Sequence, residues 1–303
     1  LGFNGYFAAY NFRHEYEPGI AYYHLDTPEK IFYDKYEPDA QIDMTIEQLH
    51  RLSEGDKPFA LFLSIGTPHD PWVSENVPPE YLERFKDKVF SLPSNYEPEN
   101  DPHADDWAKL SEQERNELTE WMRVYYAMTA NLDDNIGRLR KAIEEMGLDD
   151  NTIFVFTSDH GELFGAHGRR AKNIFYEEAI RVPFLIRWKD ELETGVSRDF
   201  ILNTVDIMPS LLSLMGLPIP KEVEGIDKST NIRGETDTDD AALMMCCGPT
   251  ATFGNGQEWR ALRSRRYTYA VFKSDGKEFL FDDKEDPYQM KNLIDDPAYA
   301  DIA

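Results

Sequence analysis

Three short apolar runs stand out in a chain that is otherwise rich in polar and turn-forming residues. They span residues 59–65, 152–157 and 182–188, and turn-forming or polar residues bound them. A near-continuous apolar run of this length is typical of a strand that is buried on both faces, as in a parallel sheet. We therefore predict three buried strands of a mostly parallel central sheet.

Other segments have the spacing of amphipathic helices, with apolar residues every three or four positions. One such segment spans residues 43–52. A longer one follows Ser111 and Glu114, which match a capping box, and ends at Gly147; it predicts one long helix or two with a break. A third helix is expected from an Asp206 cap to residue 215.

The order of these elements predicts an α/β fold with a mostly parallel central sheet flanked by helices. We expect this part to cover residues 1–225. Beyond it the strand-like segments become shorter and are separated by turns, at residues 241–247, 261–272 and 278–281. This change predicts a small antiparallel α+β subdomain over residues 226–303.

The charge of the chain limits its partners. Among 303 residues, 57 acidic side chains outnumber 32 basic ones, a formal net charge of −25. Such a surface repels phosphates and anionic lipid, so we expect no nucleic-acid partner. No run approaches the ~20 apolar residues of a membrane span. Because the chain opens on Leu1, we expect a processed or truncated N-terminus; the compartment and the oligomeric state are not indicated.

The polar segment after the second apolar run carries a chemical signal. Asp159 and His160 directly follow the expected strand, at the end of a sheet where ligands bind in doubly wound folds. A carboxylate beside an imidazole can bind a divalent metal ion. With Lys172 nearby, it could balance the charge on a tetrahedral oxyanion ester. The residues alone equally allow Asp159 to cap a turn and His160 to lie in a surface loop.

His69 occupies a similar place after the first apolar run, between Pro68 and Pro71. If both loops open on one rim of the sheet, His69 could protonate a leaving group or bind an anionic oxygen. Taken alone, a histidine in this setting is more often a loop residue in a rigid turn.

Several distinctive segments follow one another along the chain. They are Pro68-His69-Asp70-Pro71, Ser158-Asp159-His160-Gly161-Glu162, His167-Gly168 ahead of Lys172, Tyr176–Phe184, Val205–Leu212, Leu280-Phe281-Asp282 with Asp286-Pro287, and Lys291-Asn292-Leu293. Taken together and in this order, they resemble the sulfatase family of the alkaline-phosphatase superfamily. The resemblance extends over about residues 40–297, and each motif is weak without the others.

The resemblance implies an alkaline-phosphatase-like fold and a role for each matching residue. Asp159 and His160 would be metal ligands. Lys172 would contact the sulfate and stabilise the bridging oxygen, and His69 would contact the sulfate and help to protonate the leaving alcohol. The implied cofactor is a divalent metal ion, Ca²⁺ by resemblance, with Mg²⁺ or Mn²⁺ allowed by the residues. Many family members have Asn in place of His160; members with His include some that act on phosphonates or phosphodiesters.

Two parts of the family pattern are not found in this sequence. Sulfatases use a formylglycine nucleophile made within a Cys-x-Pro-x-Arg signature, and an N-terminal pair of metal-binding aspartates. The nearest match, Cys247–Ala251, has Ala where Arg is required. Asp133-Asp134 lies in an expected helix, where successive side chains point about 100° apart. We therefore expect a chain that lacks the N-terminal part of a sulfatase and does not catalyse turnover alone.

The leading prediction is a metal-dependent sulfuric-ester hydrolase acting on a small sulfated substrate: an alcohol, aryl or sugar sulfate. A phosphonate monoester or phosphodiester hydrolase of the same superfamily is the first alternative, and a non-catalytic truncated relic or binding module is the second. Candidates to line a pocket are Trp72, His103, Trp107, Arg260, Arg263, Arg265 and Arg266. For the arginines, an ordinary strand surface is the preferred interpretation.

Overall fold

A computed structural model gives the structure of the chain and describes residues 5–10, 13–97, 108–238, 240–246 and 258–302. The chain divides into two compact units. The first comprises Leu1–Leu92 and Ser111–Thr152, and the second Pro93–Leu110 and Ile153–Ala303.

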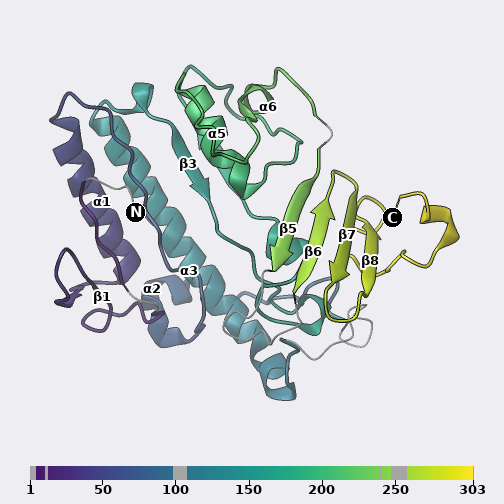
Figure 1. Cartoon of the computed structure of the whole chain (residues 1–303). Coiled ribbons are helices and arrows are strands. Elements are labelled where there is room, and N and C mark those ends of the chain that lie inside the picture. Colours follow the sequence, from purple (N-terminus) through teal and green to yellow (C-terminus); the bar gives the residue numbers. More distant parts are fainter. Residues whose placement is uncertain (1–4, 11–12, 98–107, 239, 247–257, 303) are drawn as a thin grey trace. The chain divides into compact units, whose positions relative to one another are not determined.

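The first unit is mainly helical (Figure 1). Its central feature is a long helix beside a second one, accompanied by a short strand pair and short turns of helix. Its elements are β1 (Tyr22–Tyr23), β2 (Ile31–Phe32), α1 (Glu37–Ser53), η1 (Ser74–Asn76), α2 (Pro79–Glu83), α3 (Glu112–Glu145) and η3 (Asp149–Asn151).

Helix α3 begins and ends where the sequence predicts, as one uninterrupted helix. The Ser111 side chain accepts a hydrogen bond from the Glu114 amide, and the Glu114 carboxylate accepts one from the Ser111 amide. These bonds satisfy two donors that a helix start leaves without partners. At the other end Gly147 adopts a left-handed φ of 68°, which a glycine tolerates without strain.

Helices α1 and α3 are joined by a polar cluster inside the first unit. Asp39 Oδ1 accepts hydrogen bonds from Asn131 Nδ2 at 2.9 Å and from Asn135 Nδ2 at 2.6 Å. Both asparagines are fully buried, and Asn135 also donates to Asn131 at 3.0 Å. Because buried polar groups must keep their partners, this cluster fixes how the two helices are aligned along their axes.

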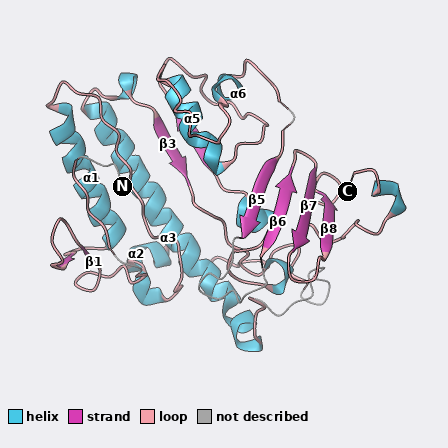
Figure 2. Ribbon diagram, in the orientation of Figure 1, coloured by secondary structure: helices cyan, strands magenta, loops and turns pink. Residues whose placement is uncertain are grey.

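The second unit contains the remaining strands (Figure 2). It has a two-stranded pair, a four-stranded sheet and short helices. Its elements are β3 (Phe154–Thr157), η4 (Ala166–Gly168), α4 (Glu177–Ile180), β4 (Phe184–Arg187), α5 (Thr204–Leu214), α6 (Ser229–Arg233), β5 (Ala242–Cys246), β6 (Trp259–Arg263), β7 (Tyr267–Phe272), β8 (Glu278–Asp282) and η5 (Pro297–Tyr299).

The expected mostly parallel sheet differs from the pairing that the structure shows. Strands β3 and β4 run antiparallel, with Phe154 opposite Arg187 and Thr157 opposite Phe184. Within the described part of the chain, every strand ladder is antiparallel, and residues 59–65 form none. The burial is also less than a parallel strand requires, since Leu185 is 64% exposed. An apolar run shows that a segment is extended but not the direction of its partner.

The four strands β5 to β8 form an antiparallel sheet in sequence order (Figure 1). The sheet packs on residues from well before position 225, because Leu163, Phe175 and Tyr176 share one core cluster with Trp259 and Phe281. The sheet and the segment around residues 163–179 therefore belong to the same compact unit. The division of the chain at residue 225 stays a prediction.

Helix α5 begins in a way that the sequence interpretation did not foresee. The cap is Asn203, not Asp206: the Asn203 side chain accepts from the Thr204 amide, while Asp206 accepts from the Asn203 amide at 3.0 Å. Asp206 Oδ1 accepts a further hydrogen bond from the Ile226 amide, so this carboxylate also holds the loop before α6 against the start of α5.

No helix in the part of the chain that the structure describes is both long and apolar enough to cross a bilayer.

Candidate functional site

The turn that carries His69 lies in the first unit. The His69 amide donates to Gly66 O at 3.1 Å, and the buried Trp72 indole donates to Pro68 O at 2.9 Å. His69 Nδ1 lies 2.9 Å from Asp70 O and 3.0 Å from Asp70 Oδ1. A carbonyl oxygen only accepts, so Nδ1 carries the proton in this contact. The His69 side chain is 26% exposed, and Nε2 lies on the side of the ring away from this bond.

A second histidine, His14, stacks on His69. Their ring centroids are 4.0 Å apart and their planes differ by 15°. Asn76 connects the two segments, because its buried side chain donates to His14 O at 2.9 Å and to Pro71 O at 3.2 Å. The sequence interpretation missed His14, since nothing local near residue 14 signals a partner so distant in the chain.

Asp159 and His160 lie in a turn directly after β3, in the second unit. Asp159 Oδ2 and His160 Nε2 are 3.4 Å apart. His160 Nδ1 lies 2.8 Å from Gly161 O and donates to it, so in the neutral ring Nε2 carries the lone pair that a metal ion needs. The Asp159 side chain is 82% exposed and that of His160 35%. The pair thus presents one oxygen and one nitrogen donor side by side toward solvent.

Backbone contacts hold this turn in place. The Gly161 amide donates to Ala179 O, at the end of α4, at 2.8 Å. Gly161 also packs so closely on this helix that an added Cβ would lie 2.0 Å from Glu178 O. Only glycine fits such an approach of two backbones. Helix α4 therefore positions the turn that carries Asp159 and His160.

The segment that leads to Lys172 is connected to the same turn. The Leu163 amide donates to Ala171 O at 2.9 Å, and Glu162 Oε1 accepts from the Ala171 amide. Lys172 is the next residue and is half-buried. The structure thus brings the loop of Lys172 beside the turn of Asp159 and His160.

A buried polar group supports this loop from inside. His167 is fully buried, stacks on Tyr176 at 3.8 Å, and its Nε2 lies 3.3 Å from Asn95 Nδ2. Asn95 Nδ2 also lies 2.7 Å from Glu178 Oε1, and burial raises the pKa of that carboxyl. Asn95 was missed in the sequence because it lies in a segment that has no regular pattern.

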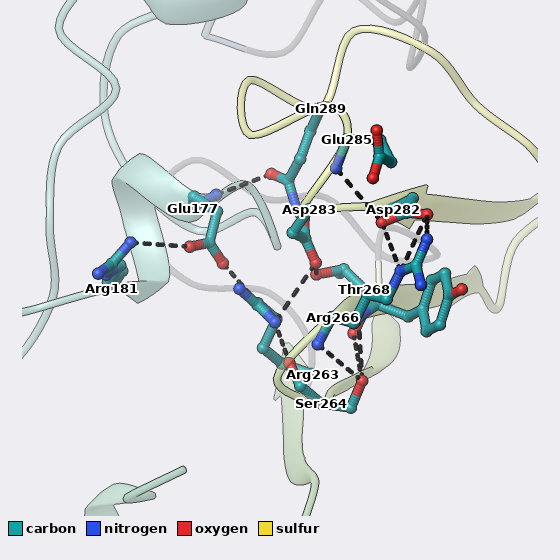
Figure 3. A network of polar contacts seen from close by, with 11 residues as sticks. Glu177, Arg181, Arg263, Ser264, Arg266, Thr268, Asp282, Asp283, Glu285 and Gln289 are labelled. Atoms are coloured by element: carbon teal, nitrogen blue, oxygen red, sulfur yellow. Dashed lines mark hydrogen bonds and ion pairs between the residues drawn. The ribbon is translucent and has the colours of Figure 1, made fainter. Parts of the chain in front are cut away.

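The arginines near the β6–β7 turn form ion pairs within the protein (Figure 3). Arg263 Nε lies 2.6 Å from Glu177 Oε1, and Arg266 binds Asp282 at 2.7 Å. Gln289 adds a bond, since its Oε1 accepts from the Glu177 amide at 2.8 Å. This network attaches the start of α4 to the C-terminal sheet. It supports the interpretation of these arginines as structural.

Arg260 donates to Cys246 O at 3.2 Å and Arg265 pairs with Asp237 at 2.5 Å, so these two arginines also contact the protein itself. The aromatic and histidine candidates are either buried or outside the described residues. Trp72 is only 8% exposed and packs against Trp121 and Tyr125, so it belongs to the core. His103, Trp107 and the segment Cys247–Ala251 lie outside the described residues. Cys246 is buried at the end of β5.

The predicted site residues fall into two groups. Asp159, His160 and Lys172 lie in connected turns of the second unit, whereas His69 lies in the first. That these four side chains line one substrate-binding site stays a prediction. Among the residues that the structure describes, no group of three or more Asp, Glu, His or Cys side chains is placed to hold a metal ion. Asp159 and His160 therefore supply two donors of suitable type, fewer than the six that hard cations take.

Comparison with known proteins gives consistent matches along the chain. The family model described as Sulfatase matches residues 2–217. The model described as N-sulphoglucosamine sulphohydrolase, C-terminal, matches residues 165–303. An ulvan-active sulfatase of Formosa agariphila is 36% identical over 298 residues, which cover 97% of this chain and 55% of that protein. The chain thus spans about half the length of this relative.

Solved structures agree with the fold. The crystal structure of a putative sulfatase from Bacteroides fragilis has a TM-score of 0.77 at 31% identity, covering 94% of this chain and 60% of that one. A phosphonate monoester hydrolase of Agrobacterium radiobacter has a TM-score of 0.72 at 25% identity, covering 89% and 58%. These neighbours support an alkaline-phosphatase-like α/β fold.

Proposed function

This chain belongs to the sulfatase family, and from that premise we propose that the protein is a metal-dependent sulfuric-ester hydrolase. One observation of the structure carries the proposal. A carboxylate oxygen of Asp159 and the lone-pair nitrogen of His160 lie 3.4 Å apart on a turn that the backbone holds in place. Both side chains reach solvent, so their donor atoms are accessible to a cation.

Asp159 and His160 would hold a divalent cation, for which the resemblance favours Ca²⁺. Members of the family generally depend on a divalent metal ion. When bound, such an ion supplies positive charge that polarises the ester oxygens. Because His160 Nδ1 donates to Gly161 O, Nε2 is the ring nitrogen that would bind the ion.

Lys172 and His69 would act on the sulfate ester itself. The Lys172 ammonium would contact the sulfate and stabilise the bridging oxygen as negative charge develops there. His69 would contact the sulfate and help to protonate the leaving alcohol, a role that requires a nitrogen of fixed direction. The bond from Nδ1 to Asp70 O supplies that direction.

The substrate class that we propose is a sulfated sugar. Support comes from the name of the ulvan-active relative, and a sugar sulfate is an ester that this chemistry can hydrolyse. The 303 residues contain no Cys-x-Pro-x-Arg signature for the nucleophile. We therefore expect no turnover from these residues alone, so activity has to be measured on the full-length native protein.

The decisive test compares turnover of matched aryl sulfate and aryl phosphonate esters. We expect faster sulfate hydrolysis that is lost in a chelator and restored by Ca²⁺, with Mg²⁺ and Mn²⁺ as comparisons. Faster phosphonate turnover would favour the alternative that His160 and the Agrobacterium neighbour support. No turnover of either ester, with all three metals supplied, would favour the non-catalytic alternative.

A further inference from the structure

We propose that His14 is a positioning residue that holds the His69 imidazole in its working orientation. This inference rests on the proposed function, because it assigns His14 a task in the step that His69 performs. It draws on a contact between distant segments of the first unit that the family motifs do not include.

The stack between the two rings is close and nearly parallel. A centroid distance of 4.0 Å with planes 15° apart is full contact of two aromatic faces. One face of His69 is therefore covered. Since the ring can turn about its last side-chain torsion with little intrinsic preference, a covered face is a strong restraint on its plane.

A second restraint acts within the plane of the ring. His69 Nδ1 donates to Asp70 O at 2.9 Å, which fixes the edge of the ring that faces the backbone. Together the stack and this bond set both the plane and the in-plane direction of His69. Nε2, on the opposite edge, is then left with one direction in which to meet a leaving oxygen.

Asn76 fixes the distance between the two histidine segments. Its Nδ2 group donates to His14 O and to Pro71 O, and its Oδ1 accepts from the Tyr16 amide at 2.8 Å. Asn76 is only 3% exposed, so its bonds are shielded from water. The position of His14 thus follows from a built connection, and not from a chance contact of two surface loops.

The test measures turnover of the aryl sulfate by the native protein with substitutions at both histidines. We expect His14→Ala to lower kcat about tenfold with KM within about twofold, because a misdirected proton donor affects the transition state and not substrate binding. His14→Phe, which keeps a flat ring on His69, should restore kcat to within about threefold of wild type. His50→Ala, at an exposed histidine of α1, is the matched control and should change nothing.

An NMR measurement checks the geometry independently of activity. The ring of His14 should shift the carbon-bound ring protons of His69 upfield, and His14→Ala should remove that shift while the melting temperature and the other histidine signals stay in place. The His69 signals are assigned by their loss in His69→Ala.

The outcomes separate this inference from the proposed function. If His69→Ala abolishes turnover but His14→Ala leaves kcat unchanged, the inference is wrong and the function stands. If His14→Phe is as slow as His14→Ala, stacking is not what His14 contributes, and the inference is also wrong. If His69→Ala keeps wild-type turnover, the role of His69 is wrong and the inference falls with it.

Discussion

The turn of His69 and the turn of Asp159 and His160 are held in different ways. Around His69 the side chains hold the turn, through the His14 ring and the Asn76 amide. Around Asp159 the backbone holds it, through Gly161 and Ala179, and the carboxylate stays 82% exposed. The difference fits the proposed tasks. A group that moves a proton needs a fixed direction, whereas donors to a cation must leave their oxygen and nitrogen atoms accessible to it.

The largest effect should follow from removing the charge of Asp159 or of Lys172 in the adjoining loop. In the native protein, Asp159→Ala or Lys172→Ala should lower kcat by ~10²-fold or more, because each removes charge stabilisation in the transition state. Stability should change little, since the exposed Asp159 carboxylate contributes little to the fold.

Steady-state kinetics and urea unfolding of the same samples check this. The control variants are Asp133→Ala and Lys141→Ala, at exposed positions of α3. Wild-type turnover in either variant would contradict the assignment of that residue to the active site. A large loss of stability in Asp159→Ala would erase the contrast between the two turns.

Two glycine substitutions should show how differently the two turns are packed. At Gly161 a new Cβ would lie 2.0 Å from the Glu178 carbonyl oxygen, and backbone cannot move aside cheaply. At Gly66 it would meet Tyr16 Cε1 at 2.8 Å and the Tyr10 hydroxyl at 3.0 Å, which are side-chain atoms. We expect Gly161→Ala to cost about 3 kcal/mol of unfolding free energy and Gly66→Ala about 1 kcal/mol.

Denaturant unfolding of the two variants under one set of conditions measures this difference. The reverse order would mean that the turn of His69 is the more rigidly packed of the two.

A smaller effect should come from the ion pair that attaches α4 to the C-terminal sheet. Glu177→Gln removes one charge from a pair in which the Glu177 and Arg263 side chains are 14% and 16% exposed. Because Asp283 still faces Arg263 at 3.4 Å, we expect a loss of about 1–2 kcal/mol in unfolding free energy.

Glu193→Gln, which breaks the more exposed pair with Arg198, is the control and should cost less than about 0.5 kcal/mol. Equal effects in urea melts would show that the network does not support α4.

A further prediction is a pH dependence of stability that comes from Asp283. Burial raises the pKa of this carboxyl to about 6, despite the nearby Arg263 guanidinium. Its pKa is then higher in the folded than in the unfolded state, so its stabilising contribution is present at low pH and is lost as the pH rises through about 6. Asp283→Asn should reduce the fall in melting temperature that accompanies a rise of pH through about 6. An unchanged pH profile in the variant would contradict the shift.

Local signals in the sequence were enough for some parts of the fold and the site. Ser111, Glu114 and Gly147 define α3 through contacts with their own neighbours in the chain. Asp159 and His160 are adjacent, so their proximity follows from the sequence and the structure adds only which nitrogen faces the carboxylate.

Contacts between distant residues could not be predicted in the same way. An apolar strand gives no sign of whether its partner runs parallel or antiparallel, so the direction of β3 and β4 was wrong. The stack of His14 on His69 depends on the path of the chain between them, and no spacing rule encodes it. The same holds for Asn95, which supports His167 from a separate loop.

The Asp39 carboxylate, to which Asn131 and Asn135 both donate, has a consequence for how the sequence of this protein can evolve. Sliding α1 by one turn against α3 would separate Asp39 from Asn131 and Asn135 and leave buried amides unsatisfied. The helix pair therefore sets its own alignment without help from the segment that connects the two helices. A change of length in that connection would leave the alignment of α1 and α3 intact, provided that the turn of His69 and Asn76 keeps its contacts.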